Sequence, residues 1–147
     1  YAANRKGQPV LMADLGTVVH EFNHSFIKIE GDTKNALAKS GKTIKSYSAF
    51  CMKQQAYDSW QTILEESLVR AAEKCYFIEH WDGKVDKGIR NEMNHGFFWM
   101  PELVQTLRYY ESHRKKYPTF TSFYPEIIRF FDRYVADVEK EIQKALK

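Results

Sequence analysis

The sequence contains few cysteines and no long hydrophobic run, and both absences exclude classes of protein. Among the 147 residues, the only cysteines are Cys51 and Cys75. Because they do not form a CxxC pair, they do not predict a metal site, although a disulfide between them would indicate an oxidising compartment. No apolar stretch approaches the roughly 20 residues that a membrane helix requires. We therefore expect no membrane span.

The sequence also lacks a concentrated basic surface. Its formal net charge is +3, and its lysines and arginines are scattered along the chain. Solvated helix faces explain such charges, so no nucleic-acid partner is expected. No signal peptide is recognisable, and the first residue is Tyr1 and not methionine. We therefore expect the chain to be a fragment of a longer precursor, from which targeting information has been removed.

Alternating strand patterns are absent, whereas apolar residues recur at helical spacing. The hydrophobic content of 44% and the charged content of 28% fit one domain with a sizeable core. Asp32 is expected to cap a short second helix that Gly41 ends, residues 43–55 are ambiguous, and residues 8–12 could pair with a missing upstream part. The sequence thus predicts a mainly α fold, a multi-helix bundle forming one domain over residues 1–147. The expected helices cover approximately residues 14–29, 32–39, 58–80, 101–116 and 125–146.

The string His20-Glu21-Phe22-Asn23-His24 is the most informative motif in the chain. On an α-helix, His20 and His24 lie one turn apart, offset by about 40° and by about 6 Å along the axis, so both imidazoles can reach one tetrahedral metal ion. Glu21 then lies beside the metal and not on it. This placement suits a general base for a metal-bound water, which is the zinc-peptidase interpretation of the spacing.

The residues around this motif indicate that it lies on an amphipathic helix. Five apolar residues form one arc of the helical wheel, and His20 and His24 fall on the other side. A histidine pair that only fills a core would lie within the apolar arc. Gly16 stands one turn before His20, where it leaves clearance for a ligand; alternatively, it marks the frayed start of the helix. The arc consists of Leu15, Val18, Val19, Phe22 and Phe26.

A catalytic zinc site usually has three protein ligands and one open position, so a third side chain is required. The metzincin continuation of the motif is absent, because Ile27 and Glu30 occupy its glycine and histidine positions. We expect Glu66, because it points away from the apolar arc of its helix and Arg70 follows one turn later, where it can orient the carboxylate. In the alternative interpretation, Glu66 and Arg70 form only a surface ion pair. The other candidates are Glu65, Glu73, His80, Asp82, Glu92 and His95.

Two strings together resemble a known group of enzymes. The His-Glu-Phe-Asn-His-Ser-Phe string, with Glu66 in Leu-Glu-Glu-Ser-Leu-Val-Arg-Ala-Ala, is similar to the gluzincin group of zinc metallopeptidases, to which thermolysin belongs. With Gly-Phe-Phe-Trp at residues 96–99 and Tyr-Pro-Thr at residues 117–119, the chain also resembles an uncharacterised family of secreted bacterial proteins known only as a domain of unknown function. This second resemblance extends from about Val18 to Phe131.

The resemblance implies a set of roles for individual residues. His20, His24 and Glu66 would be the Zn²⁺ ligands and Glu21 the base. In thermolysin-like enzymes a tyrosine nine residues before the ligating glutamate helps to polarise the substrate carbonyl, and Tyr57 has this spacing. The family would also place the protein outside the cytoplasm, secreted or periplasmic.

The chain departs from the thermolysin-like pattern in three respects. Arg70 stands where an aspartate normally braces a zinc histidine, so the sequence does not show which residue holds the imidazoles. The separation of His24 and Glu66 is about twice the usual one, and the upstream sheet that forms a wall of the substrate cleft is not in this chain.

These patterns predict a zinc-dependent hydrolase with the fold of the helical half of a zincin, most simply a metallopeptidase acting on a peptide or protein substrate. Tyr57 is the first candidate for stabilising the oxyanion and His95 the second. The alternatives are a zinc-binding pseudoenzyme, a helical interaction module in which the motif is accidental, and a metal hydrolase with another kind of substrate.

Overall fold

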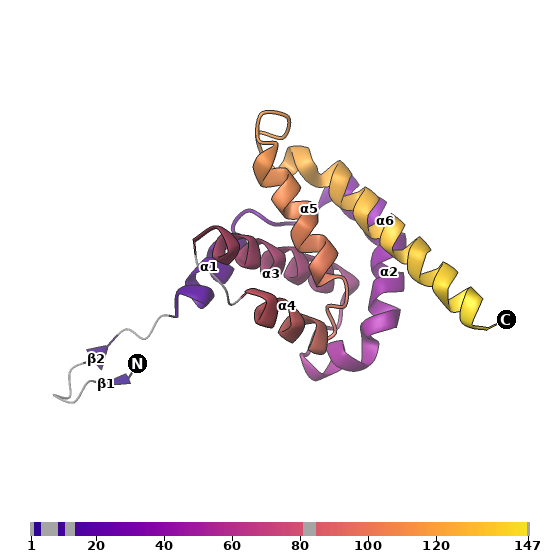
Figure 1. Ribbon diagram of the computed structural model, residues 1–147, viewed down its shortest axis with the longest axis horizontal. Coiled ribbons are helices and arrows are strands. Elements are labelled where there is room, and N and C mark those ends of the chain that lie inside the picture. Colours follow the sequence, from indigo (N-terminus) through magenta and orange to yellow (C-terminus); the bar gives the residue numbers. More distant parts are fainter. Residues whose placement is uncertain (1, 4–8, 11–13, 81–84, 147) are drawn as a thin grey trace.

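Six α-helices make up most of the described part of the protein, as a computed structural model shows (Figure 1). The structure describes residues 2–3, 9–10, 14–80 and 85–146. This composition confirms the prediction of a mainly α fold. None of the described helices combines the length and the hydropathy that a membrane crossing requires. The helices are α1 (Leu15–Asn23), α2 (Gly31–Gln54), α3 (Trp60–His80), α4 (Val85–Asn94), α5 (Met100–Ser112) and α6 (Phe120–Ala145).

Two very short strands precede the helices. β1 (Ala2–Ala3) and β2 (Pro9–Val10) pair in antiparallel fashion, with Ala2 opposite Val10. The expected strand at residues 8–12 falls partly outside the described residues. Its described part, Pro9–Val10, pairs with β1.

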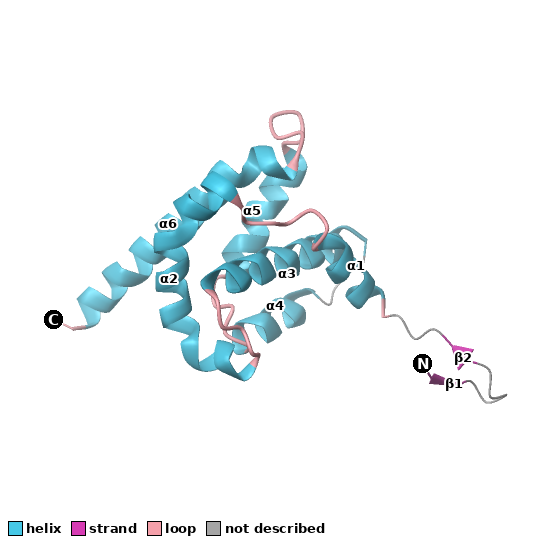
Figure 2. Ribbon diagram, turned by 180° about the vertical axis from the view of Figure 1, so that it is seen from behind, coloured by secondary structure: helices cyan, strands magenta, loops and turns pink. Residues whose placement is uncertain are grey.

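Helix α3 lies in the middle of the bundle, and four of the other helices pack on it (Figures 1 and 2). It contacts α1, α2, α4 and α5, whereas α6 packs on α2 and α5. Most of its apolar arc is buried: Ile63, Leu64, Leu68 and Ala71 are fully shielded from solvent, and Trp60 and Ile78 are partly buried. Burying one large aliphatic side chain contributes about 1.5–3 kcal/mol. Several buried side chains of this kind therefore fix the orientation of α3, and with it the position of its polar face.

Helix α2 corrects the prediction of a short helix ended by Gly41. The helix continues from Gly31 to Gln54, and its N-cap is Glu30 and not Asp32. Gly41 is buried, and a Cβ atom there would collide with the ring of Trp60 at the start of α3. The glycine thus permits close approach of two helices, which outweighs its low helix propensity.

Helix α6 begins earlier than Pro125, where the sequence analysis placed its start. The side chain of Thr119 accepts a hydrogen bond from the Ser122 backbone N–H at 3.2 Å, and the Ser122 hydroxyl accepts one from the Thr119 N–H at 3.3 Å. This reciprocal cap starts the helix at Phe120. Pro125 is then accommodated inside the helix, at the loss of one backbone hydrogen bond.

Aromatic side chains fill much of the core, with Phe97, Trp99, Phe123 and Phe131 fully buried. The indole N–H of Trp99 donates to the Ser67 hydroxyl at 2.9 Å, so its polar atom is satisfied on α3. Two other aromatic side chains, those of Phe98 and Tyr109, are exposed. Both cysteines are free thiols, and the disulfide that the sequence left open is not formed.

Candidate metal centre

Helix α1 is shorter than predicted, and the segment after it is fixed by side chains from other helices. The helix ends at Asn23, and residues 25–30 continue in irregular conformation and not as helix up to Ile29. The Ile29 N–H donates to Glu65 Oε1 at 2.8 Å, and the Gln61 amide donates to the Ile29 carbonyl at 3.0 Å. These partners satisfy the backbone polar groups of Ile29 while its side chain is buried. The anchored loop is therefore more stable than an additional helical turn would be.

The two histidines of the motif converge. At the start of α1 the Asp14 carboxylate accepts a hydrogen bond from the Gly16 N–H at 3.3 Å, and His20 follows on the side that faces α3. The Nε2 atoms of His20 and His24 lie 3.3 Å apart, and the ring centroids lie 5.0 Å apart. His24 is the C-cap residue, so both rings belong to the last turn and a half of the helix.

Glu66 on α3 completes a three-residue cluster with the two imidazoles. Its Oε1 lies 3.3 Å from His24 Nε2, and its Oε2 lies 3.7 Å from His20 Nε2. One ligand atom from each of these three residues can be chosen so that all lie within 4.8 Å of one another. A tetrahedral zinc ion with bonds of about 2.0–2.1 Å needs ligand atoms about 3.4 Å apart. The donor set and its spacing therefore fit such an ion.

The other candidate third ligands have different roles or positions. Glu65 binds the Ile29 backbone and the Gln61 side chain. His80 and His95 are exposed, and neither belongs to the three-residue cluster. Asp82 lies outside the described residues.

Glu73 contacts His20 from the opposite side of the ring to Glu66. Its Oε2 lies 3.4 Å from His20 Nδ1. This contact raises the pKa of His20 above its ordinary value of 6.5 despite partial burial, and the pKa of Glu73 is lowered because its contacts with His20 and Lys74 outweigh burial. When Nδ1 carries the proton, Nε2 offers its lone pair to a metal. Glu73 thus supplies the imidazole brace that the sequence analysis did not identify, although its position two helical turns after Glu66 could have indicated it.

Tyr57 and Arg70 both hold the Glu66 carboxylate. The Tyr57 hydroxyl donates to Glu66 Oε2 at 3.1 Å and accepts from Arg70 Nη2 at 3.1 Å. Arg70 Nε lies 3.4 Å from the same carboxylate oxygen. The Glu66 side chain is only 12% exposed, so this arrangement differs from the exposed ion pair considered as an alternative. To polarise a substrate carbonyl, Tyr57 would first have to release Glu66.

Glu21, the expected base, is exposed on α1 between the two histidines in sequence. Among the described residues, no hydrogen bond or ion pair engages its carboxylate. The side chain is therefore free to rotate toward the open side of the imidazole pair.

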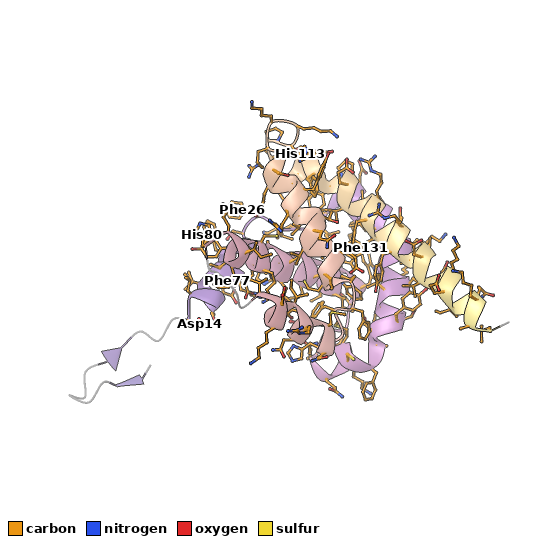
Figure 3. The ribbon with its side chains drawn as sticks, in the orientation of Figure 1. Asp14, Phe26, Phe77, His80, His113 and Phe131 are labelled. Atoms are coloured by element: carbon orange, nitrogen blue, oxygen red, sulfur yellow. The ribbon has the colours of Figure 1, made fainter. Side chains whose placement is uncertain are left out.

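The apolar arc of α1 lies outside the core, and none of the residues of α1 is buried. Phe22 is 62% exposed and Phe26 is 59% exposed. Together with residues of α3, α5 and the segment before α6, they line a groove of about 740 Å³. Figure 3 shows Phe26 and His80 at the same end of the molecule. α1 therefore contacts α3 mainly through its histidine side, and its apolar side borders the groove.

Comparison with known proteins identifies the family. No curated protein and no solved structure matches the chain. A family model described as "Domain of unknown function (DUF4932)" matches residues 12–130. The match includes both histidines and Glu66, and it confirms the predicted resemblance to an uncharacterised family. The chain belongs to the DUF4932 family.

Proposed function

We propose that the protein is a zinc-dependent hydrolase, most simply a metallopeptidase with His20, His24 and Glu66 as ligands. The observation that carries the proposal is the convergence of these three side chains, with contacts of 3.3–3.7 Å between their donor atoms. Two neutral imidazoles and one carboxylate are a common ligand set for catalytic zinc, which keeps a fourth position for water or substrate. The His24 side chain is 36% exposed, so this corner of the cluster is accessible from solvent.

Zinc, when bound, lowers the pKa of a coordinated water and polarises a carbonyl. Glu21 is adjacent to His20 on α1 and has no competing partner among the described residues, so it is free to accept a proton and later pass it to the leaving amine. Glu66 is held by Tyr57 and Arg70, and His20 is held by Glu73. These contacts restrict ligand motion, which favours a preformed site.

The first experiment measures zinc in protein purified without added metal. We expect about one zinc per chain, and much less in the His24→Ala variant. A zinc content near zero in the unaltered protein, unchanged by this substitution, would contradict the metal site and favour the helical interaction module.

The second experiment separates an enzyme from a zinc-binding pseudoenzyme. The Glu21→Gln variant should retain zinc, because Glu21 is not a ligand, and should lose hydrolysis of a fluorogenic peptide library. Equal hydrolysis by the variant would mean that Glu21 is not the base. An absence of hydrolysis by the unaltered, zinc-loaded protein across peptide and ester substrates would favour the pseudoenzyme.

A further inference from the structure

A closed ring of polar contacts joins two of the proposed ligands behind the cluster. Contacts of 2.9–3.4 Å connect its successive members, and the ring closes where His20 Nε2 lies 3.7 Å from Glu66 Oε2. We refer to it as the polar ring. Its members, in order, are Glu66, Tyr57, Arg70, Glu92, Lys74, Glu73 and His20.

Glu92, on α4, lies opposite the cluster in this ring and is 7% exposed. Its Oε2 accepts a hydrogen bond from Arg70 Nη1 at 2.9 Å, and its Oε1 lies 3.1 Å from Lys74 Nζ. A buried carboxylate is tolerated when cationic partners satisfy its oxygens. Here each oxygen has one such partner, and the two partners stand one turn apart on α3.

Arg70 connects Glu92 to the carboxylate ligand. Its three nitrogen atoms face Glu92, Tyr57 and Glu66, respectively. Its guanidinium carbon also lies 4.9 Å from the centre of the Phe97 ring, which confines the planar group on one side. The position of Arg70 therefore determines where Oε2 of Glu66 is held.

Lys74 connects Glu92 to the histidine ligand through one further side chain. Lys74 Nζ lies 3.0 Å from Glu73 Oε1, and the other oxygen of Glu73 faces His20 Nδ1. Lys74 is itself buried, with 9% of its surface exposed. The ammonium group thus has Glu73 and Glu92 as its charged partners and divides its attraction between them.

We propose that Glu92 is a positioning residue of the metal centre, acting on Glu66 through Arg70 and on His20 through Lys74 and Glu73. This inference rests on the proposed zinc site. Without the charge of Glu92, Arg70 and Lys74 are attracted more strongly to Glu66 and Glu73. The carboxylate oxygens then turn toward the two cations, and a metal ion has to compete for them. Glu92 therefore keeps both ligand braces available without contacting a ligand atom.

The Glu92→Gln variant tests this proposal through metal binding and not through activity. Zinc affinity is measured by competition with a chromophoric chelator, and ligand geometry by the visible absorption of the Co²⁺-substituted protein. We expect zinc binding to be weaker by up to about tenfold and the Co²⁺ spectrum to change. Loss of a residue bonded directly to a ligand typically weakens metal binding by about 10–100-fold, and Glu92 acts one contact further out. The matched control is Glu126→Gln on α6, which removes a carboxylate bound to Arg129 and Tyr117 and should leave both readouts unchanged.

Unfolding of the metal-free variants separates positioning from a purely structural role. Glu92→Gln with lower stability but unchanged zinc affinity and Co²⁺ spectrum would overturn the proposal and leave the zinc site intact. Failure of the unaltered protein to bind zinc would overturn the proposed function as well. If Glu92→Gln does not fold, Glu92→Asp keeps the charge but withdraws the carboxylate from Arg70 and Lys74 by one methylene group. Weaker zinc binding by Glu92→Asp would then support the proposal, and unchanged binding would refute it.

Discussion

The contact between His20 and Glu73 predicts a pH-dependent contribution to the stability of the metal-free protein. The raised pKa of His20 gives a contribution that is fully present below the ordinary value of 6.5 and is lost as the pH rises through the folded-state pKa. The lowered pKa of Glu73 gives one that is present above its ordinary value of 4.5 and is lost as the pH falls through the folded-state pKa. The pair is therefore most stabilising between these two ordinary values.

The Glu73→Gln variant removes this contribution. The two side chains are 19% and 15% exposed, and their closest atoms are 3.4 Å apart, which corresponds to a partly screened ion pair. We expect a loss of about 0.5–1 kcal/mol at pH 5.5 and a smaller loss at pH 8.5. For a domain of this size, the loss at pH 5.5 corresponds to a decrease in Tm of about 1–4 °C.

Urea unfolding with a metal chelator present, at both pH values, measures this difference directly. Glu79→Gln is the control, because Glu79 is an exposed glutamate on the same helix. The loss of unfolding free energy in Glu79→Gln is subtracted from the loss in Glu73→Gln at each pH. This subtraction removes the contribution of other titrating groups, which are the same in both variants. An equal loss of stability at pH 5.5 and pH 8.5 would show that His20 protonation is not coupled to Glu73.

Three further predictions concern the ligand assignment, a close backbone approach and thiol reactivity. Glu66→Ala should strongly reduce zinc binding in a chelator competition, whereas Glu65→Ala should lower stability with little effect on zinc affinity; the reverse result would transfer the ligand role to Glu65. Gly96→Ala should lower the free energy of unfolding by about 1–3 kcal/mol, because φ is +100° and the new Cβ would lie 2.5 Å from Cys51 Cβ. Unchanged stability in chemical denaturation would refute this prediction. Burial raises the pKa of Cys75 to about 12, so iodoacetamide should alkylate Cys51 and not Cys75 in the folded protein at pH 8. Equal labelling of the two thiols in mass spectrometry would contradict the burial of Cys75.

The sequence predicted the elements whose structure depends on regular spacing. The 3-and-4 pattern of α3 correctly identified most of its buried apolar residues, although Val69, outside the arc, is also buried. The four-residue separation of His20 and His24 correctly placed their rings together. Glu66 was also correctly expected near them, because the apolar arc of α3 fixes the direction of its other side. Local periodicity was sufficient in these cases, because the direction of the apolar face of a helix also fixes the direction of its polar face.

Features that depend on contacts between distant segments were not predictable in the same way. Gly41 was expected to end a helix because its sequence context contains no sign that Trp60 packs against it. Glu73 and Glu92 were both considered as metal ligands, whereas the structure gives them cationic and imidazole partners in the polar ring. Which acidic residue faces the imidazoles depends on the angle between α1 and α3, and a single sequence does not encode that angle in any local pattern.

The anchoring of residues 25–30 has a consequence for how far the surroundings of the histidines extend. The hydroxyl of Tyr124, on α6, donates to the Lys28 carbonyl at 2.5 Å and accepts from the Lys28 N–H at 3.1 Å. A residue near the end of the sequence therefore fixes the backbone just four positions beyond His24. A truncation that deletes α6 would remove this support, so a shortened protein that retained every proposed ligand would still lack part of what keeps the second imidazole in place.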